Sequence, residues 1–406
     1  MPAVAAEPAA RPRWLTRGVG SVGAASFFSD AGHEIATSVL PTFVTVTLRS
    51  SAGVLGVIEG VADALAGVAK LLGGPLANDE RRRLRMASGG YVVTALATGS
   101  IGLAATVWQV GVLRSVAWLA RGVRSPARDA LLASLAPPEA YGRAFGLERA
   151  GDNLGAVVGP LLAAGLVTWL GVRHTILLSA VPGLFAAIAI VFAAAEATRH
   201  RTPGVRRRVR LELRGLHEAG VARPLLPVSA FELGNVATSL LVLRATTLLH
   251  DGSRSIAAAT SLAVLLYAAH NLAAAFVAFG GGHWLDRAGP RVVFASGAAT
   301  FAAGYAVFAL PSHAWPVLGG AFVLAGIGKG LAETAESALF ARLLPDHLRG
   351  SGFGLLGGVQ SFGDFASSAV VGVLWSAVSP LVGFAYAAGW MVVSLVAASG
   401  IERGQD

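Results

Sequence analysis

Charged residues interrupt several long apolar stretches of this 406-residue chain, where each charge needs a partner or a purpose. In the stretch "ARGVRSPARDALLAS", Arg121, Arg124 and Arg128 are separated by three and four residues, so they share one face of a helix. A charge at the centre of a membrane helix costs roughly 2.5–3.5 kcal/mol on insertion scales. We therefore expect these arginines to pair with carboxylates, to hold a charged ligand, or to reach lipid headgroups from a helix end.

A second group of ionisable residues could move protons. Asp30, His33 and Glu34 in "SDAGHE" share one helix face, and a carboxylate in a poorly hydrated cavity can take up and release a proton. The alternative is structural pairing with a basic residue of a neighbouring helix. Further candidates lie in other apolar stretches, namely the stripe formed by Glu59, Asp63 and Lys70, together with Glu232, Arg244 and His270. A lone histidine such as His270 is more often a packing residue than a proton carrier.

The elements that carry these residues are membrane helices. Hydrophobic residues make up 54% of the chain and charged residues 14%, whereas soluble domains carry about 25% charged residues. The net charge of +9 is concentrated in short segments between apolar runs, which excludes nucleic acid as the expected partner and indicates membrane orientation. The chain has no cysteine, so thiol chemistry and disulfides are excluded. The N-terminal "MPAVAAEPAARPRWLTRG" has no apolar core, so we expect no cleavable signal peptide.

A spanning helix needs about 20 apolar residues, and the sequence predicts twelve of them. They are expected at 20–48, 53–76, 86–107, 108–133, 144–170, 172–195, 225–249, 255–280, 290–310, 314–343, 351–378 and 380–400. Arginine-rich connections alternate with connections poor in arginine, which predicts that both termini and the basic linker 196–224 are cytoplasmic. The expected divisions are a tail 1–19, a bundle 20–195, the linker 196–224, a bundle 225–400 and a tail 401–406.

An internal repeat relates the two predicted bundles. Residues 121–147 align with residues 329–355 at an offset of 208, which places "FGL" at 145–147 on "FGL" at 353–355. The same offset places Gly74 of "GGPLAND" on Gly282 of "GGHWLDR". Two homologous six-helix halves are a transporter architecture in which the substrate site lies near the bilayer midplane between the halves.

The loop "GGHWLDRAGPR" at 281–291 resembles the G-x-x-x-D-R-x-G-x-R signature of the Major Facilitator Superfamily, and "GAVVGP" at 155–160 resembles a motif of its antiporters. In the first half Asn78 stands where the acid is expected, with Asp79 one position later. The resemblance implies an all-α membrane fold with two six-helix bundles around a central cavity. It also implies conformational roles for Gly74, Asp79, Gly155, Gly159, Pro160, Gly282, Asp286, Arg287 and Arg291.

In this family the fourth and tenth helices face the cavity from opposite sides. The repeat places Lys329, Ala332 and Glu336 on the positions of the three arginines, with Glu333 opposite Ser125. We therefore expect the arginine face to meet Glu333 and Glu336 across the cavity, directly or through a charged substrate. Glu148, Arg149 and Asp152 are expected to form a gate or a structural network at the start of the fifth helix.

These features predict a bacterial inner-membrane transporter that moves a small polar or amphipathic solute by alternating access. Efflux by proton antiport is favoured, with the proton gradient as energy source and without cofactor, metal, nucleic acid or enzymatic activity. The protein is expected to act as a monomer in the lipid bilayer. Alternatives are uptake by proton symport, a non-transporting sensor or scaffold, and an intramembrane enzyme, for which the sequence contains no nucleophile elbow, no HExxH motif and no recognisable metal cluster.

Overall fold

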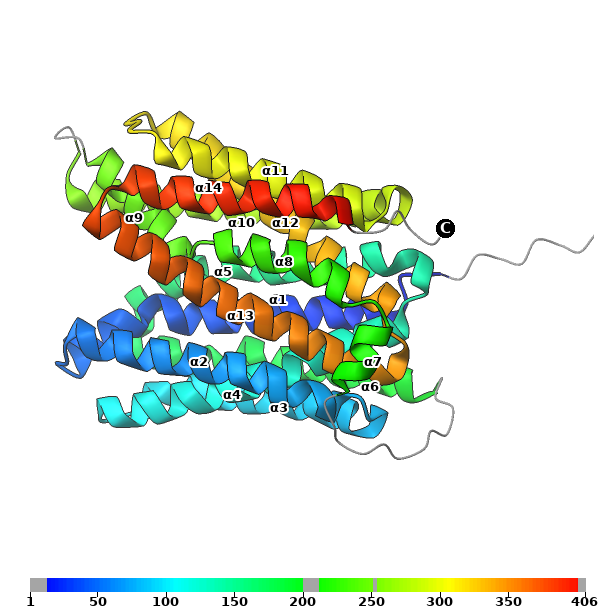
Figure 1. Cartoon of the computed structure of the whole chain (residues 1–406). Helices are drawn as coiled ribbons and strands as arrows, with labels where there is room; N and C mark the ends of the chain where they lie inside the picture. Colours follow the sequence, from blue (N-terminus) through cyan, green and yellow to red (C-terminus); the bar gives the residue numbers. More distant parts are fainter. Residues whose placement is uncertain (1–12, 200–211, 251–253, 401–406) are drawn as a thin grey trace, which may run out of the picture.

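A computed structural model describes residues 13–199, 212–250 and 254–400, and within these ranges it contains helices and no β-strand (Figure 1). The helices of the first half are α1 (Arg17–Thr42), α2 (Ala52–Ala77), α3 (Glu80–Ser100), α4 (Val107–Leu135), α5 (Tyr141–Leu178) and α6 (Ala180–Arg199). After the short α7 (Leu213–Glu218), the second half contains α8 (Ala222–Gly234), α9 (Thr238–Leu249), α10 (Ile256–Ala288), α11 (Pro290–Ala309), α12 (Trp315–Leu343), α13 (Asp346–Ala377) and α14 (Pro380–Ala397). Most of the basic linker, residues 200–211, lies outside the described residues.

The helices form twelve membrane spans, as predicted. Seven segments of the described chain are long and apolar enough to cross a membrane, and one of them, Pro138–Arg199, contains two spans. The remaining long helices, α1, α2, α4 and α13, carry ionisable residues within their length, which lowers their hydropathy. These four helices bring most of the interior charge into the molecule, so they depend on pairing inside the bundle.

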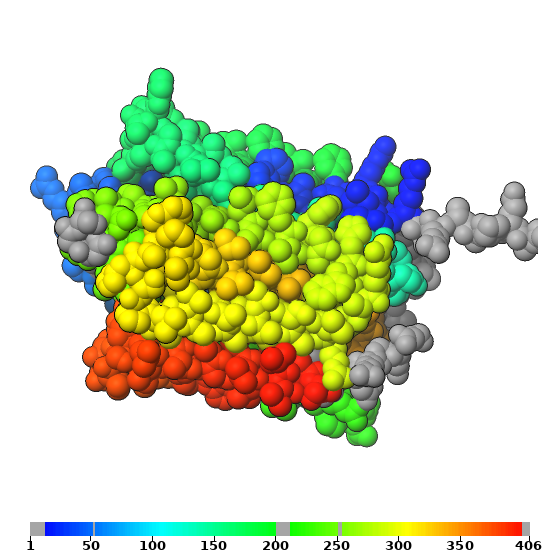
Figure 2. Space-filling model, turned by 90° about the horizontal axis from the view of Figure 1, so that it is seen from above, coloured from blue at the N-terminus to red at the C-terminus, as the bar shows by residue number. Residues whose placement is uncertain are grey.

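The two halves repeat the same packing pattern. In the first half α1 packs on α5 and α6, α2 on α4, and α3 on α4 and α6. In the second half α8 packs on α13 and α14, α10 on α12, and α11 on α12 and α14. Figure 2 shows α11 and α14 side by side along one face, in yellow and red. The prediction of two homologous six-helix bundles is therefore confirmed.

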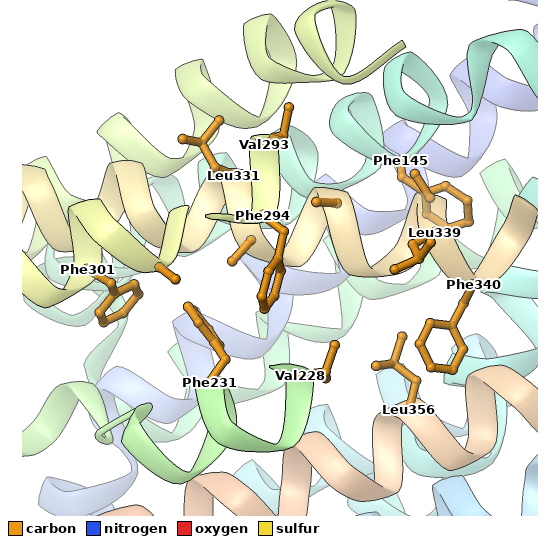
Figure 3. Packing of buried hydrophobic residues seen from close by; sticks show 14 of the residues in the cluster. Phe145, Val228, Phe231, Val293, Phe294, Phe301, Leu331, Leu339, Phe340 and Leu356 are labelled. Atoms are coloured by element: carbon orange, nitrogen blue, oxygen red, sulfur yellow. The ribbon is translucent and has the colours of Figure 1, made fainter. Parts of the chain in front are cut away.

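The ends of the bundle differ. We call the end that carries the loops 78–85, 137–143, 286–291 and 345–350 the basic end, and the opposite end the far end; α1 begins and α14 ends at the basic end (Figure 1). The largest hydrophobic core joins both halves, and the Phe145 ring of α5 lies 5.7 Å from the Phe353 ring of α13. Figure 3 shows how Phe145, Leu339, Phe340 and Leu356 gather in this shared core.

A second core lies entirely in the first half and is built from residues of the far end, including Ile35, Leu40, Phe43 and Ile176. The halves thus share a core toward the basic end, whereas the first half has a separate core of its own at the far end.

One span differs from the predicted continuous helices, and one predicted boundary between spans is met. The seventh, expected at 225–249, is broken into α8 and α9 by the extended residues 235–237. The boundary between the fifth and sixth spans lies at Gly171, whose φ of 72° ends the fifth helix in a left-handed conformation that suits glycine. Pro160 lies within α5, and the helix continues through it.

Candidate functional site

The interior charges lie near the middle of the spans, between the two halves. Asp30 is near the middle of α1, Arg121 near the middle of α4 and Lys329 near the middle of α12. Because these helices cross the same bilayer thickness, their central residues lie at a similar depth. Both halves therefore carry charged residues near the middle of their spans.

The α4 arginines share one face, as their spacing predicts, and this face lies against α1. Arg121 Nη2 donates to Asp30 Oδ1 at 2.7 Å, and Arg124 Nη2 donates to Ser29 Oγ at 2.7 Å. The Arg124 guanidinium also lies 3.6 Å from the centre of the Tyr91 ring. Asp30 neutralises Arg121, whereas Arg124 is stabilised by a hydroxyl and an aromatic face.

Arg128 belongs to a buried ion network closer to the basic end. Its Nη1 lies 2.7 Å from Glu148 Oε1 and its Nη2 lies 2.9 Å from Asp129 Oδ1. Ser26 Oγ donates to the same Glu148 oxygen at 2.7 Å, and Arg149 Nε lies 3.5 Å from the other oxygen. Two cations thus face two carboxylates, so the network can be buried without net charge.

The predicted pairing of the α4 arginines with Glu333 or Glu336 is wrong in this conformation. Their partners all belong to the first half, because α4 turns its arginine face toward α1 and α5. The residue that crosses to α12 is Arg149: its Nε lies 3.9 Å from Glu333 Oε2, and its Nη2 donates to Ser337 Oγ at 3.3 Å. The expectation of a gate at the start of the fifth helix fits this position.

Toward the far end, the first half contains an aromatic and charged cluster that the sequence prediction missed in part. Arg114 Nη2 lies 2.9 Å from Glu59 Oε2, and the Arg114 guanidinium lies 3.9 Å from the Trp118 ring centre. Trp118 Nε1 donates to Asp63 Oδ1 at 2.6 Å, and the His33 ring lies 4.5 Å from the Trp118 ring. Arg114 and Trp118 continue the Arg121 face at intervals of four and three residues, which is the signal that could have identified them.

Lys70 does not share a wall with Glu59 and Asp63, contrary to the predicted stripe. Its Nζ crosses to the second half and donates to Ser361 Oγ at 2.8 Å, next to Gly357 of α13. The two carboxylates instead face α4. The reason is that α2 packs on α4 along one side and on α13 along another.

Three interior charges have no close partner. Within the described part of the chain, the side chains of Glu34, Asp152 and Lys329 make no hydrogen bond or ion pair. Glu333, Asp152 and Asp364 are charged groups near Lys329. Glu34, Asp152 and Lys329 therefore stay candidates for contact with a solute.

The break between α8 and α9 is held by side chains of other helices. The Val236 amide donates to Tyr305 Oη at 2.9 Å, and the Ala237 amide donates to Ser368 Oγ at 2.9 Å. These bonds replace the helical bonds that the two amides lose. The break is therefore a built feature of the second half, not a frayed end.

Carboxylates gather beside this break. Asn235 Nδ2 donates to Asp364 Oδ1 at 2.7 Å and to Glu232 Oε2 at 3.1 Å. Gln360 Nε2 donates to Glu336 Oε2 at 2.9 Å. We call Glu232, Glu336 and Asp364 the acid cluster. The sequence prediction named Glu232 and Glu336 and missed the other three residues.

For each of the three missed residues, a local feature of the sequence could have indicated a role in the site. Gln360 and Asp364 are four residues apart in the otherwise apolar stretch "GGVQSFGDF", so they share one helix face. Asn235 follows Gly234 in "ELGN", a pair with weak helix propensity inside a hydrophobic run. Their proximity depends on the packing of α8 against α13.

At the basic end, Asp286 connects the second half to the start of α5. Its Oδ1 accepts from the Gly142 amide at 2.7 Å, and its Oδ2 accepts from Arg143 Nε at 2.8 Å. A carboxylate at a helix N-terminus is favoured by the free amides and the helix dipole. Gly142 also faces Gly282, where a side chain on either residue would collide with the other helix.

The symmetric contact in the first half is uncharged. Asn78 Oδ1 accepts from the Ser351 amide at 2.9 Å, and Asn78 Nδ2 donates to Ser351 Oγ at 2.7 Å. Gly74 packs against Gly350 and Gly354 of α13. Asn78 thus occupies the position that corresponds to Asp286, with a neutral side chain.

The resemblance implied conformational roles for Asp79, Arg287 and Arg291. The contacts of these residues are different from that expectation. Asp79 caps α3, since its Oδ1 accepts from the Arg82 amide at 3.0 Å. Arg287 and Arg291 make no ion pair or side-chain hydrogen bond to any described residue. Arg143 and Arg342 contact Asp286 in their place, with Arg342 Nη2 3.4 Å from Asp286 Oδ1.

A third contact closes the basic end outside the membrane-spanning segments. Arg83, which is 1% exposed, places its Nη1 2.9 Å from Asp346 Oδ1 at the start of α13. Partial burial opposes ionisation of Asp346, but the Arg83 guanidinium outweighs it and lowers the pKa of that carboxyl. Arg349 adds a bond to Tyr141 of α5, so several helices of both halves meet there.

The glycines of the fifth helix allow close packing on α1. A Cβ on Gly155 would lie 2.6 Å from the Phe27 carbonyl oxygen, and one on Gly159 would lie 2.8 Å from that of Ala31. This is the small-xxx-small contact that membrane helices use. It brings α5 and its charged residues next to Asp30 and Glu34.

Arg244 and His270 have packing roles. Arg244 Nε donates to the Phe308 carbonyl at 3.0 Å, and His270 Nδ1 lies 3.1 Å from the Phe322 carbonyl oxygen. Among the described residues, no group of three or more His, Cys, Asp or Glu side chains could hold a metal ion. The candidate site therefore consists of buried and half-buried charged side chains contributed by both helical bundles.

Comparison with known sequences gives a consistent result. The sequence profile of the Major Facilitator Superfamily matches residues 22–254 and 245–403. An uncharacterized MFS-type transporter of Methanocaldococcus jannaschii is 24% identical over 388 residues, covering 94% of both chains. An uncharacterized protein of Mycobacterium tuberculosis is 32% identical over 149 residues, which span 36% of that relative. The multidrug resistance protein MdtG of Enterobacter lignolyticus is 28% identical over 161 residues, or 38% of each chain.

Solved structures share the fold. A bacterial homologue of the iron transporter ferroportin in the outward-facing state has a TM-score of 0.77 at 15% identity, covering 95% of this chain and 99% of that one. The human organic anion transporter MFSD10 has a TM-score of 0.70 at 14% identity, covering 96% and 100%. At such identities the likeness concerns the fold and not the substrate.

Proposed function

The chain belongs to the Major Facilitator Superfamily and is a membrane transporter, and we propose that it exports a small polar or amphipathic solute by proton antiport. It acts as a monomer in the bacterial inner membrane, with the basic end in the cytoplasm. The far end then opens to the outside. The proton gradient supplies the energy, and no cofactor is required.

The observation that carries the proton coupling is the binding of the acid cluster by neutral amides. Glu232 and Asp364 share the single donor group of Asn235, and Glu336 is held by Gln360. Two carboxylates that approach the same amide group repel each other when both are ionised, so we infer that one of them holds a proton. Ionisable residues inside membrane helices commonly mark proton pathways.

The first half provides a different kind of site. Asp30 is bound to Arg121, so its proton affinity depends on whether that arginine stays in place or turns to an anionic group of the solute. Glu34 lies one helical turn away without a close partner. In this proposal the first half thus provides a carboxylate, Asp30, that can exchange one partner for another. The second half provides the acid cluster, which holds protons.

Export, not uptake, is supported by two observations. The "GAVVGP" segment in α5 resembles a motif of antiporters, and MdtG, a partial relative, is named a multidrug resistance protein. Uptake by proton symport is the competing outcome of the experiment below.

The test uses everted membrane vesicles that contain the protein and an acridine dye that reports internal pH. A panel of metabolites and drugs is added after a proton gradient, acid inside, has been formed. Antiport predicts that a substrate accumulates in the vesicles and dissipates the gradient. Asp364→Asn should abolish the proton movement, and Glu139→Gln, an exposed loop carboxylate, serves as the matched control.

Accumulation without proton movement would contradict proton coupling. Substrate preloaded into the vesicles that leaves them together with protons would identify a symporter. The same vesicles without the protein give the baseline for passive uptake.

A further inference from the structure

We propose that the acid cluster at the break between α8 and α9 is the subsite for a protonated amine of the transported solute. This inference rests on the proposed function, because it names the chemical class that the exporter recognises. It assigns the ammonium group to the second half of the protein, at the level of the bilayer centre.

The first argument is uncompensated charge. Glu232 is 2% exposed and Glu336 is fully buried, yet neither lies within ion-pair distance of a lysine or arginine in the described chain. Their close contacts are the neutral amides of Asn235 and Gln360. Glu336 Oε1 is buried and has no hydrogen-bond partner at all among the described residues. A buried carboxylate oxygen of this kind requires a proton or an external donor.

The second argument is the end of α8. The Asn235 amide bonds to the Glu232 carbonyl, while Val236 and Ala237 donate to side chains of other helices. As a result, no backbone amide of the described residues donates to the carbonyls of Leu233 and Gly234. Free carbonyls and the negative end of a helix dipole favour a cation, and broken helices of transporters present such ends to their ligands.

The arrangement of the carboxylates favours an ammonium group over a metal ion as the ligand. The three carboxylates come from three helices, α8, α12 and α13, and no group of three or more described His, Cys, Asp or Glu side chains could hold a metal ion. An ammonium carries three N–H donors and can bond to separate acceptors. The chain already places one ammonium against this surface, since Lys70 Nζ donates to Ser361 one turn before Asp364.

Surrounding charges limit the site to one cation. Lys70 of α2 and Lys329 of α12 carry positive charge near Asp364, while Glu333 of α12 adds a negative charge. A second external cation would meet both lysines. The ammonium takes the place of one proton on the acid cluster, and one proton leaves for each amine that binds.

The test measures binding of small ions and does not depend on transport. Full-length protein in lipid nanodiscs is titrated at mildly alkaline pH with methylammonium chloride, tetramethylammonium chloride or sodium chloride at equal ionic strength. Thermal unfolding is followed by the fluorescence of the eight tryptophans. Methylammonium should raise the unfolding temperature saturably and release protons in weak buffer, and tetramethylammonium, which has no N–H donor, should do neither.

Glu336→Gln and Asp364→Asn should each raise the apparent Kd for methylammonium about tenfold, the effect of losing one charged hydrogen bond. Glu139→Gln should leave it unchanged. If a cluster variant does not fold, proton release from the wild-type protein still decides the question.

Equal stabilisation by sodium would show an alkali-ion site, and no response to any of the three salts would show that the cluster carries only protons. Either result overturns the amine subsite. Proton-coupled transport can persist in both cases, so failure of this inference is distinct from failure of the proposed function.

Discussion

Replacing Asp286 by Asn should open the basic end of the transporter. Asp286 of α10 is the acceptor for the Gly142 amide at 2.7 Å, the Arg143 amide at 3.2 Å and Arg143 Nε at 2.8 Å, all on α5. Its contact with Arg342 lies within the second half. Opening of the basic end separates α5 from α10, so the three bonds to α5 stabilise the closed form specifically.

The magnitude follows from the loss of charge. A hydrogen bond to a charged group contributes roughly 1.5–3 kcal/mol. Asp286 is largely buried, and an asparagine would direct its amide donors toward the Arg143 guanidinium. We expect the closed form to lose roughly 3 kcal/mol, which is about a hundredfold change in the ratio of open to closed protein.

Cysteine accessibility measures this ratio directly, because the native chain has no thiol. Ser337→Cys places a reporter on α12 at the interface with α5, where the side chain is fully buried in the closed form. Ser38→Cys places a second reporter on the exposed far-end part of α1. In the Asp286→Asn background, a hydrophilic maleimide should label position 337 from the basic end much faster and position 38 more slowly.

The matched control is Asp79→Asn in the corresponding loop of the first half, which only caps α3. It should leave both labelling rates near those of the parent protein. Unchanged labelling in Asp286→Asn, or equal effects of the two variants, would refute the role of Asp286 in closing the basic end.

Three further outcomes are expected. Arg83 lowers the pKa of Asp346, so this ion pair should stabilise the closed basic end fully above about pH 4, the ordinary pKa of aspartate. The stabilisation should be lost as the pH falls through the lower pKa of Asp346 in the folded protein. The labelling rate at position 337 should therefore not change with pH near neutrality, and it should rise in Asp346→Asn. Tyr305→Phe leaves the buried Val236 amide without its 2.9 Å acceptor and should cost about 1–3 kcal/mol, read as a lower unfolding temperature in nanodiscs. Reporter fusions after residues 80 and 290 should report the cytoplasm and those near 50, 173 and 312 the outside; a consistent reversal would contradict the positive-inside assignment.

The sequence alone determined the helical framework. Apolar runs long enough to span the bilayer, the glycine and proline positions between them, and one offset of 208 residues predicted the twelve spans in two related halves. These features are local or repeated along the chain. Helical periodicity also placed Arg121, Arg124 and Arg128 on one face, because residues three and four apart always share a face.

The partners of these arginines could not be predicted from the same information. Spacing defines which side chains share a face but not which helix that face meets. Arg128 binds Glu148 of α5 instead of Glu336, and Arg149 reaches Glu333 instead. This choice depends on the rotation of each helix in the bundle, which is decided by packing contacts such as Gly155 and Gly159 against α1.

The break in the seventh span shows the same limit most clearly. Residues 225–249 read as one apolar run, and nothing local supplies partners for the amides of Val236 and Ala237. Only the folded protein brings Tyr305 of α11 and Ser368 of α13 to these amides, and only then can the helix end at Gly234 and Asn235 reach Asp364. A backbone amide in the membrane interior must be bonded, so the tertiary structure decided where the helix could break.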